Sequence, residues 1–222
     1  MFRKALIILN STLPEPVRYR GALEAADVIL CADGGANRAM AAGIRPHYIV
    51  GDLDSVADSV RSQLPRDAFV HRPSQDASDL EKTLDFALEL GVRNATVLGV
   101  PGGRLDHQLC NLNILEKFSG RLKLLTVDSF GTGQFIRGNF SFEGPAGQQV
   151  SLIAFRRAEG ITLEGLRYPL RNAPMEWGVN NGLSNEIVSS PVRIRIRKGT
   201  LFLYRVWPDL TPSGEETGTP IL

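Results

Sequence analysis

Cysteine is scarce in this sequence, which contains only Cys31 and Cys110 among its 222 residues. Neither cysteine has the spacing of a metal-ligand pair, so the sequence gives no sign of a cysteine-ligated metal site. We expect two buried thiols of a reducing compartment and not a disulfide.

An excess of charge of either sign is also absent, because 25 Lys and Arg residues face 24 Asp and Glu residues and leave a net charge of +1. The chain therefore has no overall field to attract nucleic acid or an anionic membrane, and we expect neither as a partner. A small enzyme with small-molecule substrates fits this charge balance better.

Long apolar runs are missing as well. No stretch approaches the roughly 18 uninterrupted apolar residues of a membrane span. The opening apolar run, residues 5–9, is too short for the core of a signal peptide, and no small-residue cleavage site follows it. We predict a first buried β-strand there and expect a cytoplasmic protein that remains where it is made.

The length permits one large domain or two modest ones, and the pattern of elements changes near residue 128. Before that point, short apolar runs alternate with amphipathic segments of helical length. The expected strands are residues 5–9, 28–32, 48–50, 68–71, 96–99 and 122–127, and the expected helices are residues 35–42, 56–64, 80–90 and 107–118. This alternation predicts an α/β domain over residues 1–127 with a mostly parallel sheet flanked by helices.

After residue 128 the predicted helices disappear. Short strands separated by Gly, Pro and Asn turns are expected at residues 134–136, 140–142, 150–155, 161–163, 192–197 and 200–207. They predict a C-terminal all-β sandwich or barrel-like domain over residues 128–208, followed by a flexible tail over residues 209–222. The strict Arg-Ile alternation over residues 193–197 is typical of a sheet with one solvated face, which we favour over a nucleic-acid patch.

Four short phrases rich in carboxylates and glycines follow predicted strands of the first domain. They are Cys-Ala-Asp-Gly-Gly-Ala-Asn (31–37), Gly-Asp-Leu-Asp-Ser (51–55), Asp-Ala-Ser-Asp-Leu-Glu-Lys (76–82) and Gly-Val-Pro-Gly-Gly-Arg-Leu-Asp-His (99–107). In open parallel sheets, ligands bind beyond the carboxyl ends of the strands. Acids, glycines and a few cations gathered there suit a magnesium-bound polyphosphate. The sequence therefore predicts a phosphoryl or pyrophosphoryl transferase.

The second phrase supplies Asp52 and Asp54 as candidate metal ligands. On an extended chain, side chains two residues apart point the same way, so both acids would face one cation while Leu53 turns toward the core. Carboxylates are preferred ligands of Mg²⁺, which keeps waters that phosphates can replace. The alternative is that Asp54 or Ser55 caps a helix beginning near Val56. Capping explains one of these residues but not two acids on one side, so we favour the metal site.

The third phrase combines a helix start with further charges. Ser78 and Glu81 form a capping-box pattern at this start. Asp79 suits the positive end of the helix dipole whereas Lys82 does not, so an anion is expected beside that lysine. Phosphate contact and an ion pair with Asp79 or Asp85 are equally open for Lys82.

The fourth phrase matches neither the Walker lysine loop nor the dinucleotide glycine pattern. Its glycines still allow backbone amides to approach phosphate oxygens, and Arg104 offers them a bidentate grip. Asp106 is open to a plainer role as the N-cap of the next helix. In the first phrase, the segment from Asp33 to Asn37 ends a strand and opens a helix, where amides can meet an anion or a ribose.

Taken in order, these phrases resemble the thiamine pyrophosphokinase family, also called thiamine diphosphokinase. The resemblance rests on the DGGAN, GD-x-DS, D-x-[ST]-D-x-x-K and GGR-x-DH patterns, and it extends to a C-terminal signature over residues 165–170 and 182–186. Five ordered motifs between residues 28 and 190 are much more specific than any single one.

This resemblance implies that ATP donates its β,γ-pyrophosphoryl unit to the hydroxyethyl oxygen of thiamine and that AMP is released. The first domain would bind ATP and Mg²⁺, and the second would bind thiamine and form a homodimer with the active site between subunits. The implied Mg²⁺ ligands are Asp52, Asp54 and Asp79, and the implied catalytic residues are Asp76, Lys82, Arg104 and Asp106. The implied ATP contacts are Asp33, Gly34, Gly35, Asn37, Gly102 and Gly103, and the implied thiamine contacts are Gln75, Ser184 and Asn185.

Two other functions stay open at the level of sequence. A diphosphokinase for another hydroxymethyl heterocycle, such as a pterin, would use the same donor machinery. A regulator that binds thiamine or a nucleotide without turnover would keep the fold, although it would not need every acid and cation. The base that accepts the alcohol proton is undecided among Asp52, Asp76 and Asp106. Trp177 offers an aromatic face for the thiamine cation, although burial in the sandwich is its expected role.

Overall fold

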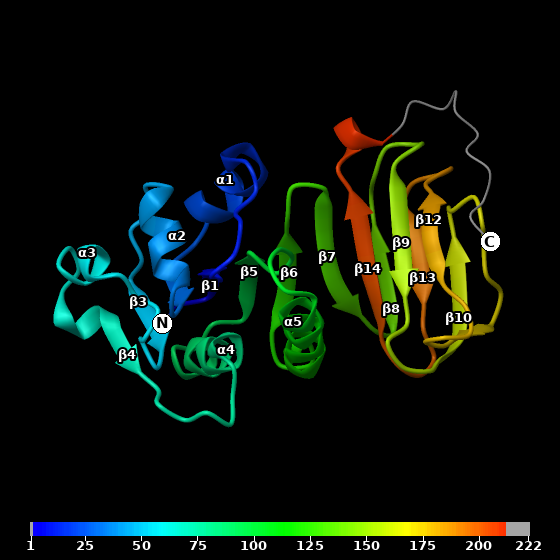
Figure 1. Cartoon of the computed structure of the whole chain (residues 1–222). Coiled ribbons are helices and arrows are strands. Elements are labelled where there is room, and N and C mark those ends of the chain that lie inside the picture. Colours follow the sequence, from blue (N-terminus) through cyan, green and yellow to red (C-terminus); the bar gives the residue numbers. More distant parts are fainter. Residues whose placement is uncertain (1, 212–222) are drawn as a thin grey trace. The chain divides into compact units, whose positions relative to one another are not determined.

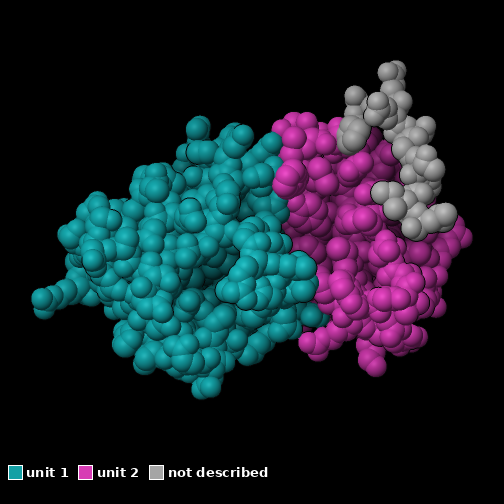
Figure 2. All heavy atoms as spheres, viewed as in Figure 1, with its two compact units in different colours: residues 1–129 teal, residues 130–222 magenta. Residues whose placement is uncertain are grey.

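The computed structural model describes residues 2–211 and divides into two compact units (Figure 2). Unit 1 runs to Ser129 and unit 2 begins at Phe130, where the sequence predicted a boundary after residue 127. Of the expected flexible tail, residues 212–222 lie outside the described residues. Within the described part, a 3₁₀ turn over Pro208–Leu210 extends past the expected start of that tail.

Unit 1 is built on a parallel sheet. Its strands are β1 (Lys4–Ile8), β2 (Val28–Ala32), β3 (Tyr48–Gly51), β4 (Phe69–His71), β5 (Asn94–Leu98) and β6 (Lys123–Val127). They run in the order β6-β5-β1-β2-β3-β4 and pair in parallel. Ile7, Leu30 and Ile49 are completely buried, as is typical of parallel strands covered on both faces. The predicted α/β fold class is confirmed.

Helices connect the strands of unit 1 (Figure 1). They are α1 (Pro16–Glu24), α2 (Gly35–Ala41), α3 (Asp58–Arg61), α4 (Asp79–Glu89) and α5 (Leu105–Phe118), with a 3₁₀ turn at Arg66–Ala68. Helix α2 packs on β1 and β2, and α4 packs on β2 and β3. Helix α4 buries Leu80, Leu84 and Ala87, whose spacing places them on one helical face.

Two helices differ from the sequence prediction. Helix α1 was not predicted, although Pro16 at its first position is a recognised helix-start signal. Helix α3 was predicted over residues 56–64 but contains only Asp58–Arg61. The residues before Asp58 form an irregular loop that side chains from other elements hold in place.

Unit 2 consists of two antiparallel sheets. The first contains β7 (Gly131–Ile136), β14 (Leu201–Val206), β9 (Gln149–Ile153) and β12 (Gly182–Glu186) in that spatial order, and the second contains β11 (Ala173–Met175), β10 (Ala158–Glu164), β13 (Val192–Arg195) and β8 (Asn139–Phe142). Val150, Leu152, Ile161 and Val192 are completely buried in a hydrophobic cluster. The predicted all-β second domain is confirmed.

Strands β11 and β12 were not predicted, and a local irregularity explains why the sequence did not indicate each of them. Pro174 lies in β11, an edge strand, where the missing N–H removes no ladder hydrogen bond. In β12, Ser184 has a left-handed backbone with φ of 53°, and the register shifts against β9. Neither strand therefore has the regular alternation that indicates a strand in a sequence.

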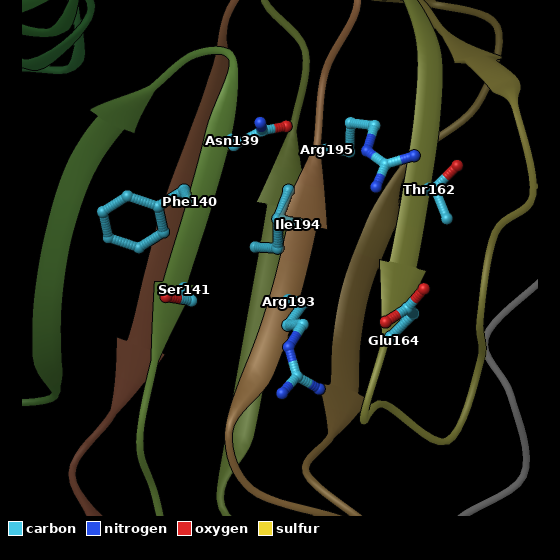
Figure 3. Close-up of a pocket in the computed structure, with 8 residues that line it drawn as sticks. All are labelled: Asn139, Phe140, Ser141, Thr162, Glu164, Arg193, Ile194 and Arg195. Carbon is cyan, nitrogen blue, oxygen red and sulfur yellow. The ribbon is translucent and has the colours of Figure 1, made fainter.

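The outer face of the second sheet confirms the alternation over residues 193–197. Ile194 is buried, whereas Arg193 and Arg195 are exposed. Figure 3 shows both arginines beside polar residues of β8 and β10, where they line a shallow cavity of about 250 Å³. This face is the solvated side of a sheet, as the sequence predicted.

The two cysteines are free thiols with different surroundings. Cys31 is buried in β2, and this burial raises the pKa of its thiol. Cys110 is exposed on α5, so the prediction that it is buried is wrong. None of the helices in residues 2–211 combines the length and apolar character that a bilayer crossing requires.

Replacing Gly35 with alanine tests how tightly α2 packs on β1. A Cβ at Gly35 would lie 2.3 Å from the backbone oxygen of Ile8. We expect Gly35→Ala to lower the free energy of unfolding, measured in urea, by about 1–3 kcal/mol, the usual cost of overpacking. Gly21→Ala in α1 is the matched control, since nothing lies within 4 Å of a Cβ there, and it should stabilise the helix slightly. Equal losses in both variants would contradict tight packing at Gly35.

Candidate active site

The four phrases line one cavity of about 730 Å³ in unit 1. It lies at the carboxyl ends of β1, β2, β3 and β5, where an open parallel sheet binds its ligands. The lining residues from the phrases are Ala32, Asp33, Gly34, Asp52, Ser55, Asp76, Ala77, Ser78, Asp79, Leu80, Lys82, Gly99, Gly102, Gly103, Arg104 and His107, and Gln75 joins them. The predicted Gly35, Asn37, Asp54 and Asp106 do not line this cavity directly.

Four lining residues outside the phrases were missed by the sequence reasoning: Leu9, Asn10, Ser11 and Asn111. Asn10 and Ser11 follow β1, so the strand-end rule applied to the other phrases would have found them. The Ser11 hydroxyl donates to the Pro101 carbonyl at 2.8 Å and so ties this loop to the glycine-rich phrase.

An acidic cluster of Asp33, Asp52 and Asp54 lies at the ends of β2 and β3. One carboxylate oxygen from each lies within 4.8 Å of the others. Asp33 is buried; its Oδ2 accepts from the Ser55 amide at 3.2 Å, but its Oδ1 is buried with no partner among the described residues. A buried carboxylate oxygen without a donor is costly unless a cation supplies the missing interaction. The donor set therefore fits a hard divalent cation.

This cluster differs from the predicted metal set, because Asp33 stands in it where Asp79 was expected. The expectation of an extended chain between Asp52 and Asp54 is wrong. Strand β3 ends at Gly51, and Leu53 has a left-handed backbone with φ of 70°, which costs a residue with a side chain about 1–2 kcal/mol. Asp52 and Asp54 converge through this turn, while Leu53 is buried as expected.

The alternative role of Asp54 or Ser55 as a helix cap is absent from the structure. Helix α3 begins at Asp58, and its N-cap residue Ala57 accepts no side-chain cap bond. Asp54 instead accepts from its neighbour's hydroxyl, Ser55 Oγ, at 2.9 Å.

Residues 52–57, here called the acidic loop, form backbone hydrogen bonds with the side chains of two helix residues. Asn37 was expected near the nucleotide, but its amide donates to the Ser55 carbonyl at 2.8 Å and accepts from the Ala57 amide at 3.0 Å. Arg61 donates to the carbonyl oxygens of Leu53 and Val56. Both side chains act on the backbone that carries the acids.

Lys82 and Asp79 form an ion pair in the first turn of α4. Lys82 Nζ lies 3.2 Å from Asp79 Oδ1, and the Lys82 side chain is buried. Burial raises the pKa of Asp79, Lys82 opposes this rise, and Asp33 and Asp52 add to it. The ion-pair alternative for Lys82 is therefore realised, while its place on the cavity also keeps phosphate contact open. Asp85, the other candidate partner, pairs with an arginine of another segment.

The capping box at the start of α4 is half formed. Ser78 Oγ accepts from the Glu81 amide at 3.3 Å, as predicted. The Glu81 carboxylate does not return to Ser78 but accepts from Lys117 on α5. The acid that the sequence assigned to the cap thus ties two helices together.

The glycine-rich phrase carries a closed arginine–aspartate pair. Arg104 donates to Asp106 through Nε at 3.1 Å and through Nη2 at 2.6 Å. This pairing is the main cause that lowers the pKa of Asp106. Asp106 lies in the first turn of α5 and Arg104 is the N-cap residue, so the alternative role of Asp106 as the N-cap is wrong. Gly102 and Gly103 both have positive φ, as a loop that presents its amides requires.

Gln75 and Asp76 lie on the exposed loop before α4. Gln75, expected at thiamine, donates from Nε2 to Asp52 Oδ2 at 3.2 Å, and this bond is the main cause that lowers the pKa of Asp52. Asp76 accepts from the Ser74 hydroxyl at 3.2 Å. Its carboxylate lines the cavity without a cation beside it in the described structure.

The predicted thiamine residues of unit 2 differ in their availability. Asn185 is buried, and its amide donates to the Tyr168 carbonyl at 2.8 Å and accepts from the Tyr168 amide at 3.0 Å and from the Glu186 amide at 2.9 Å. Asn185 therefore shapes the wall of a 270 Å³ cavity beside β12. Ser184 is exposed. Trp177 is 58% exposed and stacks on Phe155 at 5.1 Å between ring centroids, so its expected burial is wrong.

Two family models match this arrangement of two units. The model of the thiamin pyrophosphokinase catalytic domain matches residues 19–125, and the model of the thiamin pyrophosphokinase vitamin B1 binding domain matches residues 140–201. The chain belongs to the thiamine pyrophosphokinase family.

Relatives and solved structures agree with this membership. Thiamine pyrophosphokinase from Bacillus subtilis (strain 168) is 31% identical over 180 residues, which cover 78% of this chain and 84% of the relative. Thiamine pyrophosphokinase 1 from Oryza sativa subsp. japonica is 31% identical over 223 residues, which cover 86% of this chain and 82% of the relative. The crystal structure of thiamine pyrophosphokinase from Bacillus subtilis aligns with a TM-score of 0.79 at 27% identity, over 92% of this chain and 99% of that chain.

Thiamine pyrophosphokinase membership confirms the resemblance carried by the five motifs. It supports an ATP-dependent diphosphotransferase and favours neither the pterin enzyme nor the regulator without turnover. The acidic cluster lies inside the region matched by the catalytic-domain model, and Ser184 and Asn185 lie inside the region matched by the vitamin B1 model.

Divalent cations should stabilise the folded chain through the acidic cluster. We expect Mg²⁺ or Mn²⁺ to raise the melting temperature of the wild type, since a ligand at 100 times its Kd adds about 2.7 kcal/mol. Asp33→Asn should abolish this rise without lowering the melting temperature in the absence of metal, because asparagine tolerates the left-handed backbone there, φ 41°, and removes one like charge. Asp67→Asn, on an exposed turn, is the matched control. A metal response that survives in Asp33→Asn would place the cation elsewhere.

Proposed function

We propose that this chain transfers the β,γ-pyrophosphoryl unit of ATP to the hydroxyethyl oxygen of thiamine and so produces thiamine diphosphate and AMP. The observation that carries this proposal is a cavity of unit 1 lined by Asp33 and Asp52 of the acidic cluster, by Lys82 and by the glycine-rich phrase. Family membership supports the identity of both substrates. Transfer at phosphorus depends mainly on positioning and charge stabilisation, and these groups supply both.

Mg²⁺ is the proposed metal, held by Asp33, Asp52 and Asp54. When bound, it would neutralise charge on the phosphate oxygens of ATP. The buried and unpartnered Oδ1 of Asp33 supports this assignment. Asp79, which the sequence placed among the ligands, is assigned to hold Lys82 at the cavity.

Lys82, Arg104 and the amides of Gly102 and Gly103 are the proposed phosphate contacts. Arg104 presents two N–H groups to Asp106 in a planar fork, and a phosphate can accept the same two bonds. ATP binding would then exchange one anionic partner of Arg104 for another. The released Asp106 would remain close enough to orient the loop.

Asp76 is the proposed base for the thiamine hydroxyl. Of the three candidates left open by the sequence, Asp52 belongs to the acidic cluster and Asp106 is paired with Arg104. Both have lowered pKa values, which makes each a weaker proton acceptor. Asp76 lies on the same cavity, where its carboxylate accepts only a hydroxyl bond from Ser74.

Thiamine recognition is assigned to Gln75 and to the region around Ser184. The exposed Ser184 hydroxyl is free to meet the ligand, whereas Asn185 contributes through the shape of the wall. The exposed rings of Tyr168 and Trp177 provide aromatic faces for a cationic ligand. A cytoplasmic location completes the proposal, because ATP and Mg²⁺ are abundant in that compartment.

A homodimer through unit 2 is also proposed. Large apolar side chains are exposed there: Phe130, Tyr168, Trp177, Val179, Leu183 and Val188. Exposed apolar side chains that form one contiguous patch mark protein–protein contacts, and we propose that these side chains form such a patch. A thiamine cleft between subunits, implied by the resemblance, stays a prediction.

Incubation of the purified chain with MgATP and thiamine tests the reaction. We expect AMP and thiamine diphosphate in equal amounts. Asp54→Asn should lower kcat by at least about 100-fold, as loss of one electrostatic contact in the transition state does, while Asp67→Asn retains wild-type turnover. Turnover only with a pterin-like alcohol, or binding without AMP, would replace the proposal by one of the two alternatives. Near-normal activity of Asp54→Asn would remove this residue from the metal site.

Sedimentation equilibrium tests the dimer. Leu183 is 66% exposed on the edge strand β12, so Leu183→Glu places a charge where an apolar contact is proposed. We expect the wild type to sediment as a dimer at micromolar concentration and Leu183→Glu to shift toward monomer. Val17→Glu, at an equally exposed position of unit 1, is the control and should remain dimeric. A monomeric wild type would contradict the proposal.

A further inference from the structure

Two side chains that do not line the cavity form hydrogen bonds to the backbone of the acidic loop. We propose that Asn37 and Arg61 are positioning residues that preset the acidic cluster for its divalent cation. This inference rests on the proposed function, because it concerns the same metal centre. Neither residue lines the cavity or belongs to the cluster, so each would act through the backbone of the loop.

Arg61, the last residue of α3, bonds to one carbonyl in each half of the acidic loop. Its Nη2 donates to the Leu53 carbonyl and its Nε donates to the Val56 carbonyl at 3.1 Å. The guanidinium also lies over the Phe69 ring, 6.0 Å from the centroid. Leu53 stands between the two acids of the loop and has the left-handed backbone. A fixed Leu53 carbonyl sets the plane of the peptide that leads into Asp54.

Asn37, on α2, holds the second half of the loop. It donates to the Ser55 carbonyl and accepts from the Ala57 amide, so one side chain satisfies a backbone acceptor and a backbone donor. Ser55 in turn gives its amide to Asp33 and its hydroxyl to Asp54. A change at Asn37 is therefore transmitted to two of the three carboxylates through one residue.

The bonds from Asn37 and Arg61 are needed because the acidic cluster brings three negative charges together. Three carboxylates within 4.8 Å repel one another, and the repulsion favours an opened loop whenever the cation is away. Bonds to four backbone groups of the loop resist this opening. Residues that orient metal ligands in this way typically change metal affinity by 10–100-fold when they are replaced.

Mn²⁺ binding to the ligand-free protein, followed by the electron paramagnetic resonance of free Mn²⁺, tests the proposal. Arg61→Lys keeps the charge but loses the planar two-carbonyl fork, and Asn37→Ala removes both of its bonds. Each should weaken Mn²⁺ binding by about 10–100-fold. Arg45→Lys is the matched control, since Arg45 donates to the Gln63 carbonyl at 2.9 Å, beyond α3 and outside the acidic loop. Arg45→Lys should bind Mn²⁺ as the wild type does.

A turnover measurement separates positioning from a general loss of structure. In both variants, the free Mg²⁺ needed for half-maximal activity should rise by the factor seen for Mn²⁺, while kcat at saturating Mg²⁺ and KM for thiamine stay near wild type. Mn²⁺ binding within twofold of wild type in both variants would overturn the inference, and so would an equal loss in Arg45→Lys. If the wild type binds Mn²⁺ but makes no thiamine diphosphate, the proposed reaction fails while the binding comparison still decides the inference.

Discussion

The catalytic unit depends on one constraint, which is that three carboxylates must stay together although they repel. The parallel register makes this possible, because Ala32 of β2 pairs with Val50 of β3 and so brings the residues after them side by side. The Asp33 amide donates to the Val50 carbonyl at 2.9 Å, which anchors this acid beside β3. Glycine is required at position 51, where β3 ends beside Asp33. A Cβ there would lie 2.9 Å from the Asp33 Cβ and 3.1 Å from an Asp79 oxygen.

The sequence was sufficient for the sheet and for the place of the site, because both follow from periodicity and from strand ends. It was insufficient for the membership of the acidic cluster. An alternating pattern implies an extended chain, but Leu53 adopts a left-handed backbone that is usually found at glycine or asparagine. No residue type at this position signals the turn. The supports from Asn37 and Arg61 are equally invisible, because they join backbone atoms from separate elements.

In unit 2, the motif of residues 182–186 located the right region but not the roles within it. A sequence motif records that Ser184 and Asn185 are adjacent, not which side chain is saturated by backbone bonds. The buried Asn185 amide is engaged with the segment at Tyr168, and this fixes the position of an exposed ring. The irregular register of β12 hid the strand from the sequence, and Ser184 lies exposed within this irregular stretch.

The balance of charge in the cavity gives the proposed cation a part in substrate binding as well as in chemistry. Lys82 is already neutralised by Asp79, and Arg104 is already neutralised by Asp106. The acidic cluster has no such cation beside it within the described chain, so the cavity carries a net negative charge before any substrate arrives. A triphosphate would be repelled by that charge. A divalent ion would offset two of the three negative charges of the cluster and so weaken this repulsion. Lys82 and Arg104 can then exchange their carboxylate partners for phosphate oxygens.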